Sequence, residues 1–288
     1  MKRLSIGICL FLLIFNYACS PKPKEDKRII ITVTIEPQRY FAERLVDDSI
    51  FVIKTMVAPG VSPETYDPTP NQLTELAKSR AYFGIGQIGF EQTWMSRLKV
   101  NNPRVYFFDN SEGFNFIEAE HQCHDNHIHE GTDPHIWSSP SGALKIIENM
   151  RNALIKIEAN PVNLENRYTE LCNEIKKTDQ LIRSLLDKTS QKEFIIYHPA
   201  LSYFAHDYGL KQHVIEIEGK EPSVNQIREL IRTAKEKNIK TVFIQEEFDK
   251  KNAELIAKEV GCKLVVINPL SYNWKEEMIR IAQSLADE

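Results

Sequence analysis

Short apolar runs rich in β-branched residues alternate with helix-like patterns along both halves of this 288-residue chain. Strands of a parallel sheet that is buried on both faces read as continuous apolar runs, and each parallel pair needs a crossover, usually a helix. Strands are expected at 29–35, 51–57, 81–86, 105–108, 194–197, 241–244 and 264–267, and helices at 37–46, 71–78, 223–237 and 253–260. The alternation predicts an α/β fold with two similar lobes built on mainly parallel sheets.

Two further helical patterns, at 141–158 and 162–187, lie between the halves and are separated by Asn160 and Pro161. At about 1.5 Å per residue, the second pattern is long enough to run along both lobes as a rigid strut. The domain organisation is therefore expected to be an N-terminal lobe over 29–160, a linking helix over 161–189 and a C-terminal lobe over 190–288.

The N-terminus has the form of an export signal. Lys2 and Arg3 precede an apolar run that ends at Ala18 and is too short to span a bilayer comfortably. A signal peptide is expected over 1–18, followed by a polar linker over 19–28. Cys19 stands where a bacterial lipobox places its lipidated cysteine, although Asn16 replaces the usual Leu. The prediction is an exported protein, periplasmic or at the cell surface, anchored through Cys19; a secreted protein with an incidental cysteine is the alternative.

Composition narrows the possible partners. The formal net charge is -4 and no local basic patch is found, so nucleic-acid binding is not expected. No later segment has the length of a membrane span, so membrane contact is expected only through the lipid anchor. Without Cys9 and Cys19, an odd number of cysteines remains, namely Cys123, Cys172 and Cys262. Either one disulfide or buried free thiols at Cys172 and Cys262 fits this number.

Polar residues follow several of the expected strands, and open parallel sheets bind ligands at the carboxyl ends of their strands. Glu64 lies in a Pro-rich loop, His135 lies in Asp133-Pro-His-Ile-Trp, and His198 and Asn268 come directly after strands. Two imidazoles and a carboxylate suit four-coordinate zinc. The spacing matches no short metal motif, so a solvated turn or an ordinary loop histidine is the alternative for each residue. Gln245, Glu246 and Glu247 follow the strand at 241–244 and could reach the cleft, but a solvated strand end is the favoured interpretation.

The stretch 110–134 has no sustained periodicity, and its part 118–131 is crowded with metal-binding side chains. Five of the eight histidines of the chain lie between 121 and 135. The loop candidates are His121, Cys123, His124, His127 and His129, with Asp125 and Glu130 among them. Short histidine-rich tracts bind borderline metals, so a secondary, low-affinity metal-collecting loop is predicted. A solvated loop with chance histidines is the alternative.

Four local strings resemble the metal-binding solute-binding proteins of bacterial ABC importers, a family of zinc- and manganese-binding lipoproteins and adhesin-like receptors. The resemblance runs from about Ile29 to the end of the chain. It implies two α/β lobes, a rigid linking helix and a metal ion in the cleft between the lobes. The strings are Pro59-Gly-Val-Ser-Pro-Glu-Thr-Tyr-Asp-Pro-Thr-Pro, Asp133-Pro-His-Ile-Trp-Ser-Ser-Pro, Tyr197-His-Pro-Ala-Leu-Ser-Tyr-Phe-Ala and Ile267-Asn-Pro-Leu.

The resemblance also implies ligand roles. His135 and His198 match the second and third metal positions of the family. Glu64 stands where most members have His, and Asn268 stands where an Asp is common, with water as the other candidate for the fourth ligand. A Glu in place of His moves such a site toward manganese or iron, and loss of the Asp acts in the opposite direction. Zn²⁺ is therefore expected before Mn²⁺ or Fe²⁺. In the family, a histidine-rich loop is typical of the zinc-specific members.

The function predicted from the sequence is capture of a divalent transition metal ion, zinc first, and its delivery to an ABC permease by a monomer that is not an enzyme. A zinc-dependent hydrolase is the main alternative, because three protein ligands and a water also make a catalytic zinc site. No positioned base is evident for such a reaction. A manganese- or iron-binding receptor or adhesin of the same family is the remaining alternative.

Overall fold

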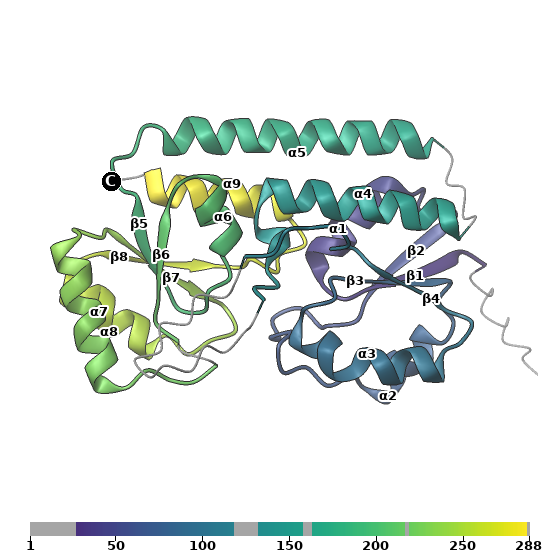
Figure 1. Ribbon diagram of the computed structural model, residues 1–288, viewed down its shortest axis with the longest axis horizontal. Helices are drawn as coiled ribbons and strands as arrows, with labels where there is room; N and C mark the ends of the chain where they lie inside the picture. The colour runs from purple at the N-terminus through teal and green to yellow at the C-terminus, as the bar shows by residue number, and fades with distance from the viewer. Residues whose placement is uncertain (1–26, 118–131, 158–162, 217–218, 287–288) are drawn as a thin grey trace, which may run out of the picture.

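The computed structural model describes residues 27–117, 132–157, 163–216 and 219–286, which form two α/β lobes with one long helix lying across both (Figure 1). Within these ranges each lobe has one parallel four-stranded sheet, in the order β2-β1-β3-β4 and β6-β5-β7-β8. The predicted two-lobed α/β fold is confirmed. The strands are β1 (Ile29–Val33), β2 (Phe51–Thr55), β3 (Ala81–Gly84), β4 (Tyr106–Asp109), β5 (Glu193–Ile196), β6 (Lys211–Val214), β7 (Thr241–Gln245) and β8 (Lys263–Ile267).

The inner strands of both sheets are buried on both faces, which explains their mainly apolar sequences. Val33 on β1 and Phe83 on β3 are fully buried, as are Ile195 on β5 and Phe243 on β7. The helices that cover the sheets are α1 (Glu36–Leu45), α2 (Pro70–Leu76), α3 (Gly89–Asn101), α4 (Pro140–Lys156), α6 (Ser202–Asp207), α7 (Val224–Glu236), α8 (Lys251–Val260) and α9 (Trp274–Ala286).

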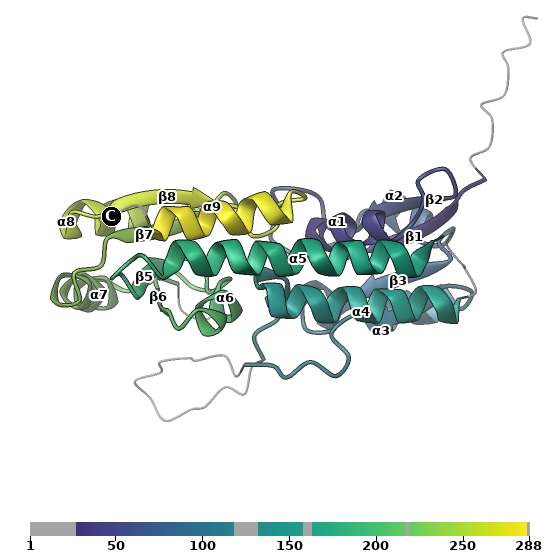
Figure 2. The same cartoon turned by 90° about the horizontal axis from the view of Figure 1, so that it is seen from above.

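Helix α5 (Leu164–Leu186) is the linking helix, and it lies within the segment predicted for it. Its 23 residues make it about 35 Å long. Figure 2 shows it lying across both lobes, alongside α4 and α9. Leu171, Ile175 and Ile182 are buried at helical spacing, so one face of α5 packs against the lobes along its length.

A second connection between the lobes is built from aromatic residues. Trp274, at the start of α9, packs its ring against Phe41 of α1 with a centroid distance of 5.2 Å. Its indole N–H donates to the carbonyl oxygen of Trp137 at 2.6 Å, and the Trp137 indole donates to the carbonyl oxygen of Pro269 at 3.0 Å. These buried contacts and α5 together oppose large relative movement of the lobes.

Four elements were not predicted from the sequence: α3, α6, β6 and α9. Cys172 and Cys262 are free thiols, so the disulfide alternative does not hold for this pair. In the part of the chain that the structure describes, no helix is long and apolar enough to cross a membrane. Residues 1–18, Cys19 and the loop 118–131 lie outside the described residues.

Candidate metal centre

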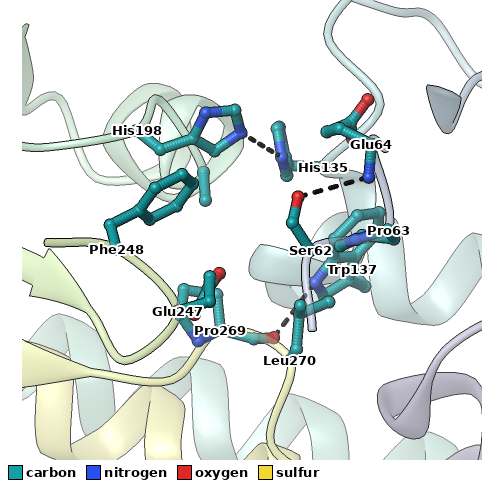
Figure 3. Close-up of a pocket in the computed structure, with 11 residues that line it drawn as sticks. Ser62, Pro63, Glu64, His135, Trp137, His198, Glu247, Phe248, Pro269 and Leu270 are labelled. Carbon is teal, nitrogen blue, oxygen red and sulfur yellow. Dashed lines mark hydrogen bonds between the residues drawn. The ribbon is translucent and has the colours of Figure 1, made fainter. Parts of the chain in front are cut away.

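A small cavity lies between the lobes, at the carboxyl ends of strands from both sheets (Figure 3). Its volume is about 20 Å³, which is room for roughly one water-sized particle. Such a cavity suits a single ion and excludes an extended organic molecule. It is lined by Ser62, Pro63, Glu64, His135, Trp137, His198, Ala200, Glu247, Phe248, Pro269 and Leu270.

Two histidines from different lobes meet in this cavity. His135 precedes a short 3-10 turn (Ile136–Ser138) in the N-terminal lobe, and His198 follows β5 in the C-terminal lobe. Their Nε2 atoms are 3.2 Å apart, and the ring planes are inclined by 74°. Two zinc ligands at about 2.0–2.1 Å in a tetrahedral arrangement stand about 3.3 Å from each other. The two nitrogens are therefore already spaced as a pair of zinc ligands.

A carboxylate holds the other nitrogen of each ring. Asp133 Oδ1 lies 2.8 Å from His135 Nδ1 and also accepts from the His135 backbone N–H at 2.8 Å. The two carboxylate oxygens of Glu216 lie 3.3 Å from His198 Nδ1. Both carboxylates favour the tautomer with hydrogen on Nδ1, so both Nε2 lone pairs face each other. That arrangement is repulsive unless a proton or a metal cation lies between the two nitrogens.

The Asp133 and His135 pair is buried and strongly polarised. Burial alone lowers the pKa of His135, but the neighbouring Asp133 carboxylate outweighs it and the pKa is raised. Burial likewise raises the pKa of Asp133, and His135 reverses the shift, so this pKa is lowered. The Tyr203 hydroxyl, on α6 of the opposite lobe, donates to the Asp133 carbonyl at 2.8 Å. The N-terminal histidine is therefore held in place partly by the C-terminal lobe.

His198 is held mainly through its backbone. The Gln245 side chain at the end of β7 donates to the His198 carbonyl at 2.7 Å and accepts from the His198 N–H at 3.3 Å. The Phe248 ring stacks on the imidazole with a centroid distance of 5.4 Å. Gln245, which the sequence placed at a solvated strand end, is in fact buried and positions a cavity residue.

Glu64 has one carboxylate oxygen held and the other without a partner. Its Oε2 accepts from the Gly89 N–H, the first residue of α3, at 3.0 Å. Its Oε1 is buried and makes no hydrogen bond. A Cβ at Gly89 would lie 2.4 Å from the Glu64 carbonyl oxygen, so only glycine permits this approach. A buried carboxylate oxygen without a partner is costly unless a cation binds there.

The structure does not bring Asn268 to the cavity, although the next two residues line it. The Asn268 Oδ1 accepts from the Leu270 N–H at 3.0 Å, which closes a local turn. Its Nδ2 donates to Glu246 at 3.2 Å. The amide oxygen that would coordinate a metal is thus already engaged in the loop.

Two acidic residues of the site, Asp133 and Glu216, were not singled out from the sequence, and Glu247 was considered for the cleft but assigned to a solvated strand end. The expectation of a solvated strand end fits Glu246, which is exposed, but Glu247 is half-buried and lines the cavity. Burial raises the pKa of Glu247. Glu216 follows the edge strand β6, which the sequence did not reveal.

Within the described residues, no three His, Cys, Asp or Glu side chains are yet close enough to hold a metal ion together. Only the two histidines are already placed as a pair, and a third ligand from the described residues would require a side chain to move. The loop candidates His121, Cys123, His124, His127 and His129 lie outside the described residues, as does Cys19.

Comparison with known proteins supports a metal-uptake role for this architecture. The ZnuA family model, described as zinc-uptake complex component A, periplasmic, matches residues 31–287. The high-affinity zinc uptake system protein ZnuA of Bacillus subtilis (strain 168) is 30% identical, over 90% of this chain and 83% of that protein. The zinc-binding lipoprotein AdcA of Streptococcus pneumoniae is 26% identical over 96% of this chain, which spans only 57% of AdcA.

A solved structure shows the same likeness in three dimensions. A crystal structure of ZnuA superposes with a TM-score of 0.84 at 34% identity, covering 90% of this chain and 98% of that one. The resemblance indicated by the four sequence strings is thereby confirmed. Because the family model spans nearly the whole described chain, this protein belongs to the ZnuA family of zinc-uptake components.

Proposed function

We propose that this protein captures Zn²⁺ between its lobes and delivers it to an ABC permease for uptake. The observation that carries the proposal is the pair of Nε2 atoms, one from each lobe, 3.2 Å apart. Each imidazole has its Nδ1 directed at a carboxylate, so both lone pairs are presented to a shared cation.

We propose His135, His198 and Glu64 as ligands. The unpartnered Oε1 of Glu64 supports its inclusion, because a bound cation would compensate that buried oxygen. Two imidazoles favour zinc over manganese, which is better suited by oxygen ligands. Asn268 fits this role less well, since its amide oxygen already accepts from the Leu270 N–H.

The family is a component of an uptake system and not an enzyme family. The hydrolase alternative also meets a physical obstacle, because catalytic zinc needs room for a substrate beside the metal. The cavity has room for roughly one water-sized particle, so a substrate could reach the metal only if the surrounding side chains moved.

The family is described as periplasmic, which agrees with an exported protein. Anchoring through lipidated Cys19 is our further proposal, supported by the export-like N-terminus and by the description of AdcA as a lipoprotein. A Cys19→Ser variant is expected to leave the membrane fraction. Retention of that variant in the membrane would contradict the anchor.

The experiment that tests the proposed function is competitive titration of zinc and manganese against a chromophoric chelator, with the mature chain. Nanomolar zinc binding and weaker manganese binding are expected. A His135→Ala, His198→Ala double variant is expected to lose tight zinc binding, whereas His206→Ala is not, because His206 lies outside the cavity and its side chain is 73% exposed. Tight binding by the double variant would contradict the assignment.

We propose the loop 118–131 as a low-affinity collector that is not required for the tight site. Deletion of 118–131 is therefore expected to leave the zinc dissociation constant unchanged and to remove additional weak binding equivalents. Loss of the tight site on deletion would contradict this separation.

A further inference from the structure

We propose that Glu247, in the loop after β7, supplies the fourth ligand to the captured metal ion, in the role that the sequence pattern gives to Asn268. This inference rests on the proposed function, since it concerns the coordination of the same ion. It assigns the residue that completes the shell and sets the charge of the site.

The first argument is the inventory of donors around the cavity. Zinc takes four ligands, and His135, His198 and Glu64 supply three. Among the described residues that line the cavity, the remaining side chains with oxygen or nitrogen donors suited to a cation are those of Ser62 and Glu247. Ser62 Oγ accepts from the Glu64 N–H at 3.3 Å and is a neutral hydroxyl. Glu247 is the remaining carboxylate.

The second argument is position. Glu247 lies in the loop between two residues that contact His198. Gln245 is two positions before Glu247, and Phe248 is the next residue after it. Gln245 is hydrogen bonded to the His198 backbone, and Phe248 stacks on the His198 ring. In Figure 3 a carboxylate oxygen of Glu247 points toward the space beneath the two imidazoles. The loop that fixes His198 therefore also delivers this carboxylate to the same cavity.

The third argument is that the Glu247 carboxylate is available. No other side chain in the described ranges forms a hydrogen bond or ion pair with it. Its neighbour Glu246 is exposed and accepts from Asn268 Nδ2 at 3.2 Å. An Asp at position 268 would place a second negative charge beside Glu246 and repel it. An amide at 268 is thus compatible with an acidic loop at 246–247.

The fourth argument is the chemistry of the ligand. A carboxylate oxygen of Glu or Asp is an established zinc ligand and carries negative charge, whereas the amide oxygen of Asn268 is neutral and attracts a dication less. Because no three candidate side chains already surround one point, the Glu247 side chain must rotate toward the histidines when the ion binds.

The test compares Glu247→Gln with Glu246→Gln and Asn268→Ala in the mature chain. Zinc affinity is measured by chelator competition, and Co²⁺ substitution reports the ligand set through its visible absorption spectrum. Glu247→Gln is expected to weaken zinc at least about 10-fold, the lower end of what loss of an outer-shell partner costs. The same variant should change the Co²⁺ spectrum. Glu246→Gln should change neither measurement. Thermal unfolding of each metal-free variant checks that it is folded.

Three outcomes distinguish a failure of this inference from a failure of the proposed function. If Glu247→Gln binds zinc as the unaltered chain does while Asn268→Ala loses affinity and alters the Co²⁺ spectrum, Asn268 is the ligand and the inference is overturned. If both variants match the unaltered chain, the fourth ligand is water and the inference is equally overturned. If instead His135→Ala leaves zinc affinity unchanged, the proposed function itself fails.

Discussion

The two lobes share one strand order but hold the side chains that we propose as metal ligands differently. In the N-terminal lobe the His135 side chain is 7% exposed and its Nδ1 lies 2.8 Å from Asp133. In the C-terminal lobe the His198 side chain is 17% exposed and its Nδ1 lies 3.3 Å from Glu216. Glu64 is fixed by the start of α3, whereas Glu247 has no such partner. The N-terminal lobe is thus a preformed platform, and the C-terminal lobe completes the site.

The two lobes also differ in which parts are expected to move when an ion binds. Helix α5 and the contacts of Trp274 with Phe41 and Trp137 restrain movement of the lobes as whole bodies. Adjustment to an ion is therefore expected in the loops after β5 and β7, which carry His198 and Glu247. Small loop movements can open the site without separating the lobes.

Single replacement of each histidine gives the largest effect and tests the asymmetry directly. His135→Ala and His198→Ala should each weaken zinc binding by more than about 100-fold. Each removes a residue that contacts the metal directly, and even the loss of a residue that only supports a ligand costs about 10- to 100-fold. Each variant also leaves a buried carboxylate without its histidine, and His135→Ala should be the more damaging because the Asp133 contact is closer, at 2.8 Å, than the Glu216 contact, at 3.3 Å. Isothermal titration with zinc measures both. A greater loss for His198→Ala would invert the proposed roles of the lobes.

A buried carboxylate makes the N-terminal platform sensitive to pH. Glu91 accepts from the neutral donors Thr34 Oγ1, Ile85 N and Gly86 N, and burial raises its pKa to about 7 from an ordinary value of 4.5. The folded state therefore retains a proton between pH 4.5 and 7 that the unfolded state releases, so the free energy of unfolding falls as pH rises through this window. The contribution is about 3 kcal/mol.

Glu91→Gln is expected to remove this contribution to the pH dependence of the free energy of unfolding. Denaturant unfolding from pH 4.5 to 8 measures it on the metal-free protein. The partners of a buried carboxylate differ in the C-terminal lobe. There Glu277 accepts from Asn268 N at 2.7 Å and forms an ion pair with Arg280 at 2.6 Å. An unchanged slope in Glu91→Gln would show that other groups cause the pH dependence.

The carboxylates that contact the two histidines should differ in the same direction as the histidines do. Loss of Asp133 in the N-terminal lobe should weaken zinc binding more than loss of Glu216 in the C-terminal lobe. Asp133→Asn is expected to weaken zinc about 10- to 100-fold, the range for an outer-shell partner. Glu216→Gln should have a smaller effect, because its contact with His198 is longer, at 3.3 Å. Chelator competition on the two variants gives the ratio. Equal losses would mean that the shorter contact at Asp133 adds nothing to the platform.

The smallest expected effect concerns the fit of Glu64 against α3. In Gly89→Ala the new Cβ would lie 2.4 Å from the Glu64 carbonyl oxygen and 2.8 Å from its Oε2, so the Glu64 backbone and carboxylate must shift and zinc affinity should fall several-fold. In a Glu64→Ala background the backbone must still shift, but zinc affinity should not fall further, because residue 64 no longer carries a ligand. Additive losses in this cycle would mean that Gly89 acts on the site by another route.

Much of the fold could be predicted because burial leaves a plain pattern. Strands β1, β3, β5 and β7 are mostly apolar because both faces of each sheet are covered. Strand β6 reads Lys-Gln-His-Val, since an edge strand needs little burial, and α3 buries only Phe90, Glu91 and Leu98, too few for a helical stripe. Helix α9 did carry a helical spacing, at Trp274, Met278, Ile281 and Leu285, and was predictable.

The candidate site was predictable in part. Local strings singled out His135, His198 and Glu64, but their meeting across two lobes depends on tertiary packing that spacing does not encode. Glu247 could not be separated from Glu246 by sequence, because the turn after β7 decides which carboxylate points inward. For Asn268 the sequence suggested a ligand that the structure does not support. Its side-chain oxygen accepts a local hydrogen bond from Leu270 N.

The central claim is that one zinc ion joins the two lobes through His135 and His198. A crystal structure of the zinc-loaded mature chain, with the ion located by its anomalous scattering, tests it most directly. We expect one strongly bound ion about 2.0–2.1 Å from both Nε2 atoms, with carboxylate oxygens completing the shell. An ion bound to only one of these imidazoles, or held elsewhere with the cavity unchanged, would contradict the account.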